Sequence, residues 1–323
     1  MPVSIIHEYL MHAVYFAPRG RYRLLALGGS LSHRYLSPGD LLIGFVGDAG
    51  AGKSLLIRGM FPGLELTNDD DGINVRPLPL LDDFERKHFR SRTYHLDVRF
   101  EMAFTQPWTI VEAIKEAIKH DRRVIIEHFD LIYPMLKRNA QILIGIGEEV
   151  IVTRPNIFGP EPQEIVDIVY ESLIYRKMAH TAEDITGLVL EHEFGIKCPK
   201  SHNDIKHGFV IEFGEKPTLD LDALENRVKA IIDKDFCIYY HDETNIKVGE
   251  NLIFPCTGPR LHVKKTSEII NFRLVKEFIW DPMDELYGLV GLVGSVDEGN
   301  SPAAPPDQFQ LIRRARGRSK AVT

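Results

Sequence analysis

One segment of the chain combines glycine spacing and a lysine in a way that suits a phosphate group. The spacing is G-x-x-x-x-G-K-S, filled by Gly47, Asp48, Ala49, Gly50, Ala51, Gly52, Lys53 and Ser54. Glycines let the backbone fold into a nest whose N–H groups point inward at phosphate oxygens. Lys53 would reach the β- and γ-phosphates of a nucleotide, and the Ser54 hydroxyl would bind Mg²⁺. The motif therefore predicts a binding site for ATP with magnesium.

The residues on either side of this motif favour the same interpretation. The apolar run 41–46 precedes it and suits a strand covered on both faces of a parallel sheet. Leu55, Leu56 and Ile57 follow it and predict a helix starting at Lys53, whose positive N-terminal end would favour phosphate. The alternative is a glycine-rich turn that matches the spacing by chance.

A magnesium site usually needs a second carboxylate at the end of a neighbouring strand. Glu127 follows the apolar run 124–126, and Asp97 follows Tyr94, His95 and Leu96. Either side chain could fill this role, and either could be an ordinary charge at a strand end. Asp130 lies three residues beyond Glu127 and is the weaker candidate.

Further charged residues follow the predicted phosphate site. Asp70 lies in the acidic run 68–72, where a carboxylate could hold or deprotonate an acceptor hydroxyl, or simply belong to a solvated turn. The cations that follow could clamp phosphate in a lid or be surface charges: Arg76, Arg86, Lys87, Arg90 and Arg92.

A second set of residues has the chemistry of metal ligands. His180 and Asp184 are four apart on a predicted helix and so share one face. Cys256 and His262 lie much later in the chain. A thiolate, two imidazoles and a carboxylate could complete a tetrahedral Zn²⁺ site, although such residues are more often ordinary surface or core residues.

The phosphate motif resembles the Walker A motif of P-loop NTPases. Within that class, runs 124–127 and 131–136 are similar to the phosphoribulokinase and uridine kinase group. Runs 37–40, 47–54 and 94–97 are similar to the ATPase partner of the bacterial tRNA threonylcarbamoylation machinery. His128 stands where the small kinases have a glycine after the glutamate, and no Arg-rich lid motif is present at the expected place.

Residues from about 176 to 277 resemble the editing, or second additional, domain of threonyl- and alanyl-tRNA synthetases and of free-standing alanyl-tRNA deacylases. The segments that carry the resemblance are those around His180, at 203–213, at 221–232, at 256–266 and at 269–276. The family pattern is His-x-x-x-His with Cys-x-x-x-His, and it implies zinc held by His180, Asp184, Cys256 and His262. Asp184 takes the place of a histidine, and His262 is displaced by two residues.

Hydrophobic periodicity and turn residues predict the elements that position these sites. Thr109 and Glu112 predict a capping box for a helix that begins after Pro107. The Pro- and Gly-rich run 155–163 predicts a linker, and a long helix follows from 164. Asp220 is expected to cap a helix over 221–232, between strands at 207–213 and 269–274.

Composition narrows the function classes. No stretch approaches the roughly 18 uncharged apolar residues of a membrane helix, and the first residues do not suggest a secretory signal. Three widely spaced cysteines argue against a disulfide framework and favour a cytoplasmic location. The net charge of −7 disfavours a whole-surface grip on nucleic acid. The basic run 313–320 could contact RNA or be a solvated terminus.

These observations predict an α/β P-loop domain with a mainly parallel sheet, followed by an α+β domain like the synthetase editing module. The expected ranges are an N-terminal extension at 1–40, the nucleotide domain at 41–158, the editing-like domain at 164–292 and a disordered basic tail at 295–323. The predicted activity is phosphoryl transfer to a small molecule or ATP hydrolysis, with Lys53, Glu127, Asp97 and Asp70 as catalytic candidates. The alternatives are an aminoacyl-tRNA deacylase with regulatory nucleotide binding and a non-catalytic, nucleotide-gated tRNA-binding module.

Overall fold

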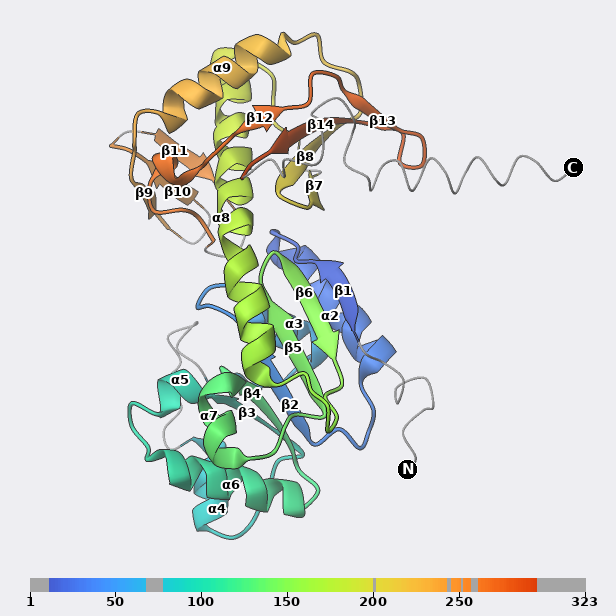
Figure 1. Ribbon diagram of the computed structural model, residues 1–323, viewed down its shortest axis with the longest axis vertical. Helices are drawn as coiled ribbons and strands as arrows, with labels where there is room; N and C mark the ends of the chain where they lie inside the picture. Colours follow the sequence, from blue (N-terminus) through green and yellow to red (C-terminus); the bar gives the residue numbers. More distant parts are fainter. Residues whose placement is uncertain are drawn as a thin grey trace, which may run out of the picture. The chain divides into compact units, whose positions relative to one another are not determined.

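The computed structural model describes residues 12–67, 78–199, 202–242, 245–250, 252–256 and 261–294. The chain divides into two compact units, one made mostly of residues up to Lys177 and the other mostly of residues from Met178 onward. Each has its own β-sheet (Figure 1). Asp70, Arg76 and the predicted basic tail lie outside the described residues.

A six-stranded sheet forms the centre of the first unit, with its strands in the order β1-β6-β5-β2-β4-β3. The strands are β1 (Ala13–Phe16), β2 (Leu42–Val46), β3 (Thr93–Asp97), β4 (Arg123–Glu127), β5 (Ile142–Ile146) and β6 (Glu149–Thr153). The four strands β3, β4, β2 and β5 run parallel, while β6 and β1 add antiparallel pairs at one edge. This confirms the mainly parallel sheet, with strands at the apolar runs that predicted them.

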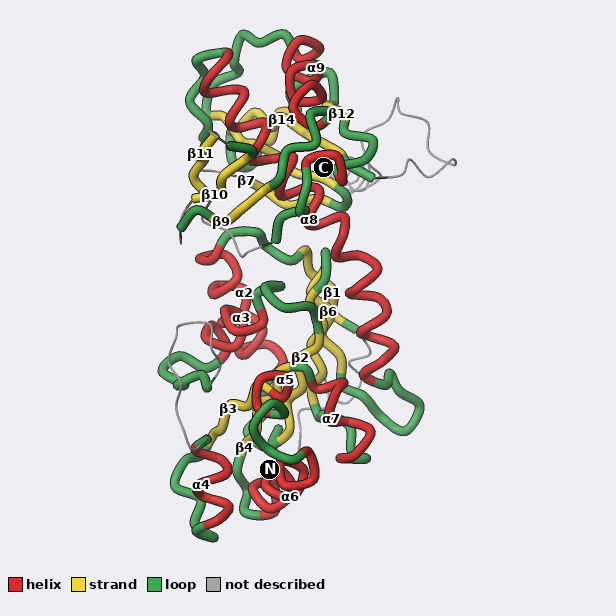
Figure 2. The backbone as a smooth tube through the Cα atoms, turned by 90° about the vertical axis from the view of Figure 1, so that its left-hand side faces the viewer, coloured by secondary structure: helices red, strands yellow, loops and turns green. Residues whose placement is uncertain are grey.

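Helices cover both faces of this sheet. Ile43 and Phe45 of β2 join the core under one pair of helices, while Leu42 and Val46 point into the opposite core. The first pair is α2 (Arg21–Tyr35) and α3 (Lys53–Met60); the other face carries α4 (Pro79–Glu85), α6 (Pro107–Lys119), α7 (Phe129–Leu136) and the start of α8 (Pro162–Glu193). Figure 2 shows α2 and α3 on one side of the strands and α7 and α8 on the other.

Helix α2 is an element that the sequence patterns did not predict. Gly28 and Gly29 lie in its middle, where glycine costs about 1 kcal/mol each relative to alanine. The structure explains Gly28, because a Cβ there would lie 2.3 Å from the carbonyl oxygen of Leu56 on α3. The two helices therefore pack backbone against backbone, and tertiary contact outweighs the weak local preference.

The start of α6 differs from the prediction. The helix begins at Pro107, with Gln106 as its N-cap and no side-chain cap, so the expected capping box of Thr109 and Glu112 is wrong. Proline suits the first helical position because its φ angle is already helical and its missing N–H would have no intrahelical partner. The proline thus starts the helix one turn earlier than the polar pattern indicated.

The second unit contains a five-stranded sheet and a helix that packs near it. Its strands are β7 (His202–Ile205), β8 (Gly208–Phe213), β12 (Arg273–Leu274), β13 (Ile279–Asp281) and β14 (Leu286–Leu292), with β14 antiparallel to β8, β12 and β13. Helix α9 (Leu221–Ile232) confirms its predicted cap, because the Asp220 carboxylate accepts hydrogen bonds from the N–H groups of Asp222 and Ala223. A separate three-stranded sheet, in the order β11-β10-β9, comprises β9 (Ile238–Tyr240), β10 (Asn245–Val248) and β11 (Leu252–Pro255), and its residues from Tyr239 onward are grouped with the first unit.

The strand predicted at 269–274 is much shorter in the structure. A 3₁₀ turn, η1 (Thr266–Glu268), precedes it, and only Arg273 and Leu274 pair with β14. Asn271 has a φ of 51°, a left-handed conformation that interrupts an extended chain. The apolar run 269–270 is therefore followed by a bend before the strand begins. The long helix predicted from 164 is confirmed by α8, and the strand predicted at 207–213 by β8.

Candidate functional site

The loop 47–54 connects the end of β2 to the start of α3. Gly47, Gly50 and Gly52 have φ angles of 142°, 76° and 100°, which other residues rarely adopt. At Gly47 a Cβ would also lie 2.7 Å from the carbonyl oxygen of Ile146. The glycines thus occupy positions where the backbone of this loop requires them. Helix α3 begins at Lys53, as the sequence predicted.

Lys53 lies in the interior of this loop. Its side chain is 4% exposed, and Nζ donates to the carbonyl oxygens of Gly47, at 3.2 Å, and Asp48, at 2.9 Å. The same nitrogen lies 3.9 Å from Oε2 of Glu127. The ammonium therefore lies between the loop backbone and a buried carboxylate.

Glu127, one of the two carboxylates predicted for magnesium, lies at the end of β4 and directly beside the loop. Its Oε1 accepts hydrogen bonds from Ser54 Oγ, at 3.0 Å, and from His95 Nε2, at 3.1 Å. Burial by itself would raise the pKa of Glu127, but the His95 hydrogen bond and the charge of Lys53 outweigh it and lower the pKa to about 2. Glu127 is therefore an anion beside the Ser54 hydroxyl.

Asp97, the other predicted carboxylate, is brought close to Glu127 by the sheet. The two residues are direct neighbours in the register of the parallel strands β3 and β4. Asp97 Oδ1 accepts the N–H of Phe100 and caps the short helix α5 (Val98–Glu101). Burial, together with the charge of Glu127, raises the pKa of Asp97. Asp130 lies in the first turn of α7, where burial raises its pKa as well.

Two histidines in this region carried no predicted role. His95 lies on β3, and its Nδ1 receives the backbone N–H of Thr67 at 3.0 Å. His128 is buried, with a φ of 56°, a left-handed conformation that glycine adopts more readily than other residues. Burial, and then the charge of Lys53, lowers the pKa of His128 to about 4. A histidine directly after the strand-end Glu127 is unusual, and this could have drawn attention to His128. No local pattern indicated His95.

Helix α8 supplies two cations to the same loop, and the sequence patterns did not predict them. Arg176 is fully buried and donates to the carbonyl oxygens of Ala51, at 3.0 Å, and Gly147, at 3.2 Å. Lys177 Nζ lies 3.2 Å from Asp48 Oδ2. Ala51 and Asp48 lie more than 120 residues before the cations that contact them, so no local pattern could reveal these two contacts.

Arg86 and Arg90, two of the cations that could have formed a lid over phosphate, are instead paired with carboxylates. Arg86 Nε lies 2.9 Å from Asp82 Oδ1, and Arg90 Nε lies 2.5 Å from Asp83 Oδ1. Asp82 and Asp83 belong to α4. These contacts support the alternative in which the two arginines form surface ion pairs.

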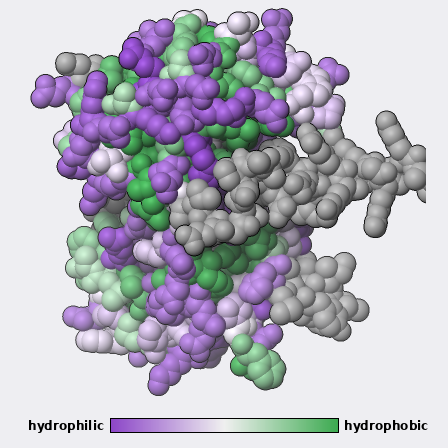
Figure 3. Space-filling view, turned by 45° about the horizontal axis from the view of Figure 1, so that its top comes forward, coloured by the Kyte–Doolittle hydropathy of each residue, from purple (hydrophilic) through white to green (hydrophobic). Residues whose placement is uncertain are grey.

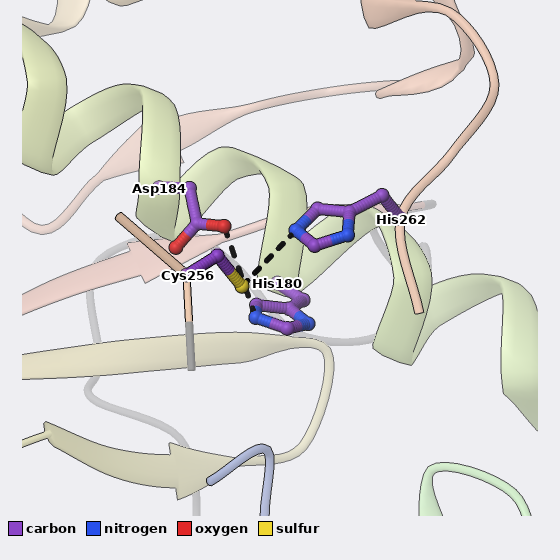
Figure 4. Close-up of side chains that lie close together, drawn as sticks. All are labelled: His180, Asp184, Cys256 and His262. Atoms are coloured by element: carbon purple, nitrogen blue, oxygen red, sulfur yellow. Dashed lines mark hydrogen bonds and ion pairs between the residues drawn. The ribbon is translucent and has the colours of Figure 1, made fainter. Parts of the chain in front are cut away.

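The four residues predicted as zinc ligands lie close together (Figure 4). His180 Nε2 lies 3.8 Å from Asp184 Oδ2, and Cys256 Sγ lies 3.6 Å from His262 Nε2. One nitrogen, oxygen or sulfur atom from each residue lies within 4.8 Å of the others. Tetrahedral ligands at zinc–ligand distances of 2.0–2.3 Å are about 3.3–3.8 Å apart. The donor set and its spacing therefore suit zinc.

Comparison of the chain with family models gives no match, and comparison with curated proteins gives none either.

In the part of the chain that the structure describes, no helix has the length and apolar character needed to cross a membrane. On the face shown in Figure 3, hydrophilic and hydrophobic residues are interspersed.

Proposed function

We propose that the first unit binds ATP with Mg²⁺ and transfers or hydrolyses the terminal phosphoryl group. The observation that supports this most directly is the contact between Ser54 and Glu127, the two predicted magnesium ligands. Ser54 lies in the first turn of α3 and Glu127 at the end of β4, and their side chains meet at 3.0 Å beside a loop whose glycines have positive φ angles.

The residues present suit a hard divalent cation. Neighbouring oxygen ligands of an octahedral Mg²⁺ lie about 2.9 Å apart, close to the Ser54–Glu127 separation. When bound, magnesium would neutralise charge on the phosphates. Lys53 would leave the carbonyl oxygens of Gly47 and Asp48 for phosphate oxygens, and the loop N–H groups would hold the rest of the phosphate chain. Catalysis on this proposal is mainly positioning and charge neutralisation.

Asp97 is our candidate for the group that orients the attacking hydroxyl or water. Its carboxyl group lies beside Glu127 in the sheet, and its raised pKa makes it a better proton acceptor than an ordinary aspartate. Asp70 keeps its predicted role as an alternative base, outside the described residues.

The test is a screen of nucleosides, small sugars and tRNA as acceptors for γ-labelled phosphate, with water as the reference. Labelled product with one acceptor class indicates a kinase, and release of phosphate alone indicates an ATPase. Lys53→Ala should abolish ATP binding or turnover, while Lys115→Ala, at an exposed position on α6, should leave both unchanged. Activity in Lys53→Ala equal to that of the unaltered protein contradicts the proposal. Binding without turnover favours a nucleotide-gated binding module instead.

A second candidate function rests on the cluster of His180, Asp184, Cys256 and His262. We propose that these residues bind zinc, as the resemblance to synthetase editing domains implies. Their donor atoms include one thiolate and two imidazoles, which zinc favours over magnesium. The corresponding activity is hydrolysis of mischarged tRNA, with nucleotide binding as a regulatory input. Hydrolysis of alanyl- or threonyl-tRNA that is lost when zinc is removed would favour this second function.

A further inference from the structure

We propose that His95 is a positioning residue that holds the Glu127 carboxylate in the orientation needed to share a magnesium ion with Ser54. This inference rests on the proposed function of the 47–54 loop. It concerns a residue that contacts neither nucleotide nor metal in that proposal and acts through Glu127.

The hydrogen bonds around His95 determine where its proton lies. The backbone N–H of Thr67 points at Nδ1 from 3.0 Å, and an N–H group can only donate. Nδ1 therefore accepts, which places the ring proton on Nε2. Nε2 lies 3.1 Å from Glu127 Oε1 and donates to it. The Thr67 hydroxyl donates to the backbone carbonyl oxygen of His95 at 2.9 Å, so Thr67 is fixed against β3 by this bond as well as by its N–H bond to the ring.

The two oxygens of Glu127 have different neighbours. Glu127 Oε1 accepts from both His95 and Ser54, while Oε2 lies 3.9 Å from Lys53 Nζ, beyond hydrogen-bond distance. Glu127 is 2% exposed, and in such a site an unrestrained carboxylate would turn toward the ammonium group. By holding Oε1 beside Ser54, His95 would keep the carboxylate where it and the Ser54 hydroxyl can share the cation.

Two substitutions at this one position separate positioning from simple structural support. In His95→Gln, the amide nitrogen takes the place of Nε2 and keeps a donor for Glu127. In His95→Asn, the shorter side chain reaches only the place of Nδ1, so it keeps the Thr67 contact and loses Glu127. Both replacements are polar and of similar size, and Tyr94→Phe serves as a control because it removes a buried hydrogen bond to Asp83 from the same strand.

The measurement is binding of a fluorescent ATP analogue to the full chain, first in EDTA and then across a Mg²⁺ titration. We expect His95→Asn to raise the Mg²⁺ concentration at half-saturation about 10- to 100-fold, the usual effect of losing such a supporting contact. Its affinity for the analogue in EDTA should stay unchanged. His95→Gln and Tyr94→Phe should keep the magnesium dependence of the unaltered protein.

Four results would overturn the inference. If His95→Asn and His95→Gln behave alike, the donor to Glu127 has no special role. If Tyr94→Phe weakens the response to magnesium as much as His95→Asn does, the effect is one of general packing in β3. If the unaltered protein binds the analogue in neither condition, the proposed function fails, and the role of His95 fails with it. If magnesium strengthens binding in the unaltered protein and does so to the same extent in His95→Asn, the role of His95 is rejected while the proposed function stands.

Discussion

Arg176 on α8 donates a hydrogen bond from Nη1 to the carbonyl oxygen of Ala51, 3.0 Å away and 125 residues earlier in the chain. The same guanidinium group donates to Gly147, at 3.2 Å, and to Pro18, at 2.7 Å. Burial lowers the pKa of Arg176 to about 9. One buried cation thus joins the 47–54 loop to two other segments of the first unit.

Replacing this arginine should affect both stability and nucleotide binding. Arg176→Met keeps most of the buried volume but leaves the carbonyl oxygens of Ala51, Gly147 and Pro18 without this donor. We expect the free energy of unfolding to fall by about 3 kcal/mol, and affinity for ATP to weaken because the loop loses a support. Urea unfolding and ATP titration measure the two effects. Arg138→Met, at an exposed site, is the control, and equal stability of the two variants would count against this role.

Neighbouring glycines in α2 should respond to alanine in opposite directions. A Cβ at Gly28 would meet the carbonyl oxygen of Leu56 at 2.3 Å, whereas at Gly29 the nearest atom is 3.7 Å away. Gly28→Ala must push α2 and α3 apart, and we expect it to destabilise the protein by about 2 kcal/mol or more. Gly29→Ala should stabilise it by about 0.5 kcal/mol, because alanine favours a helix. Thermal unfolding of both variants tests the prediction, and a shift in the same direction for both contradicts it.

Protonation of Glu225 on α9 should make the second unit less stable at low pH. Its Oε1 lies 2.6 Å from Lys229 Nζ, and its Oε2 lies 2.7 Å from Lys276 Nζ and accepts the N–H of Leu274 at 2.8 Å. Burial opposes ionisation, but these partners outweigh it and lower the pKa of Glu225 from 4.5 to about 2. A carboxyl group whose pKa is lowered by folding stabilises the fold above its unfolded pKa. That stabilisation is lost as the pH falls from about 4.5 toward 2.

Glu225→Gln tests this dependence. Because both lysines are partly exposed, we expect a loss of about 2 kcal/mol of unfolding free energy at pH 7, less than the full pKa shift implies. The difference from the unaltered protein should shrink as the pH approaches 3, as measured by urea unfolding at several pH values. Glu112→Gln, at an exposed position of α6, is the control and should show no such trend. A difference that is constant with pH would contradict the assigned cause.

The metal content of the purified protein tests the second candidate function. Zinc should be present in stoichiometric amount by mass spectrometry, and Cys256→Ala should lose it because the site loses its thiolate ligand. Cys198→Ala is the matched control: burial raises the pKa of this thiol to about 12, so it stays protonated and is a poor ligand. Zinc retained in Cys256→Ala, or lost equally in both variants, would argue against the cluster.

The sequence by itself determined the features that depend on neighbouring residues. The loop 47–54 was predictable because its glycines take positive φ angles that few other residues tolerate, and β2, β4 and β5 because buried parallel strands need continuous apolar runs. Glu127 and Asp97 were predictable as strand-end carboxylates, and Asp220 as a cap, for the same local reason. None of these features requires knowledge of which distant segments meet.

The tertiary structure decided which side chains surround those features. Sheet order places β3 beside β4, and only this places His95 within 3.1 Å of Glu127. Arg176 reaches Ala51 because α8 crosses the sheet face, and α2 forms despite its two glycines because Gly28 packs on the backbone of α3. Local preferences are weak, about 1 kcal/mol per residue or less, whereas burying a large apolar side chain contributes about 1.5–3 kcal/mol and leaving a buried polar group unpaired costs about 1–3 kcal/mol. The contacts that position the candidate site therefore depend on the folded arrangement, which local spacing does not encode.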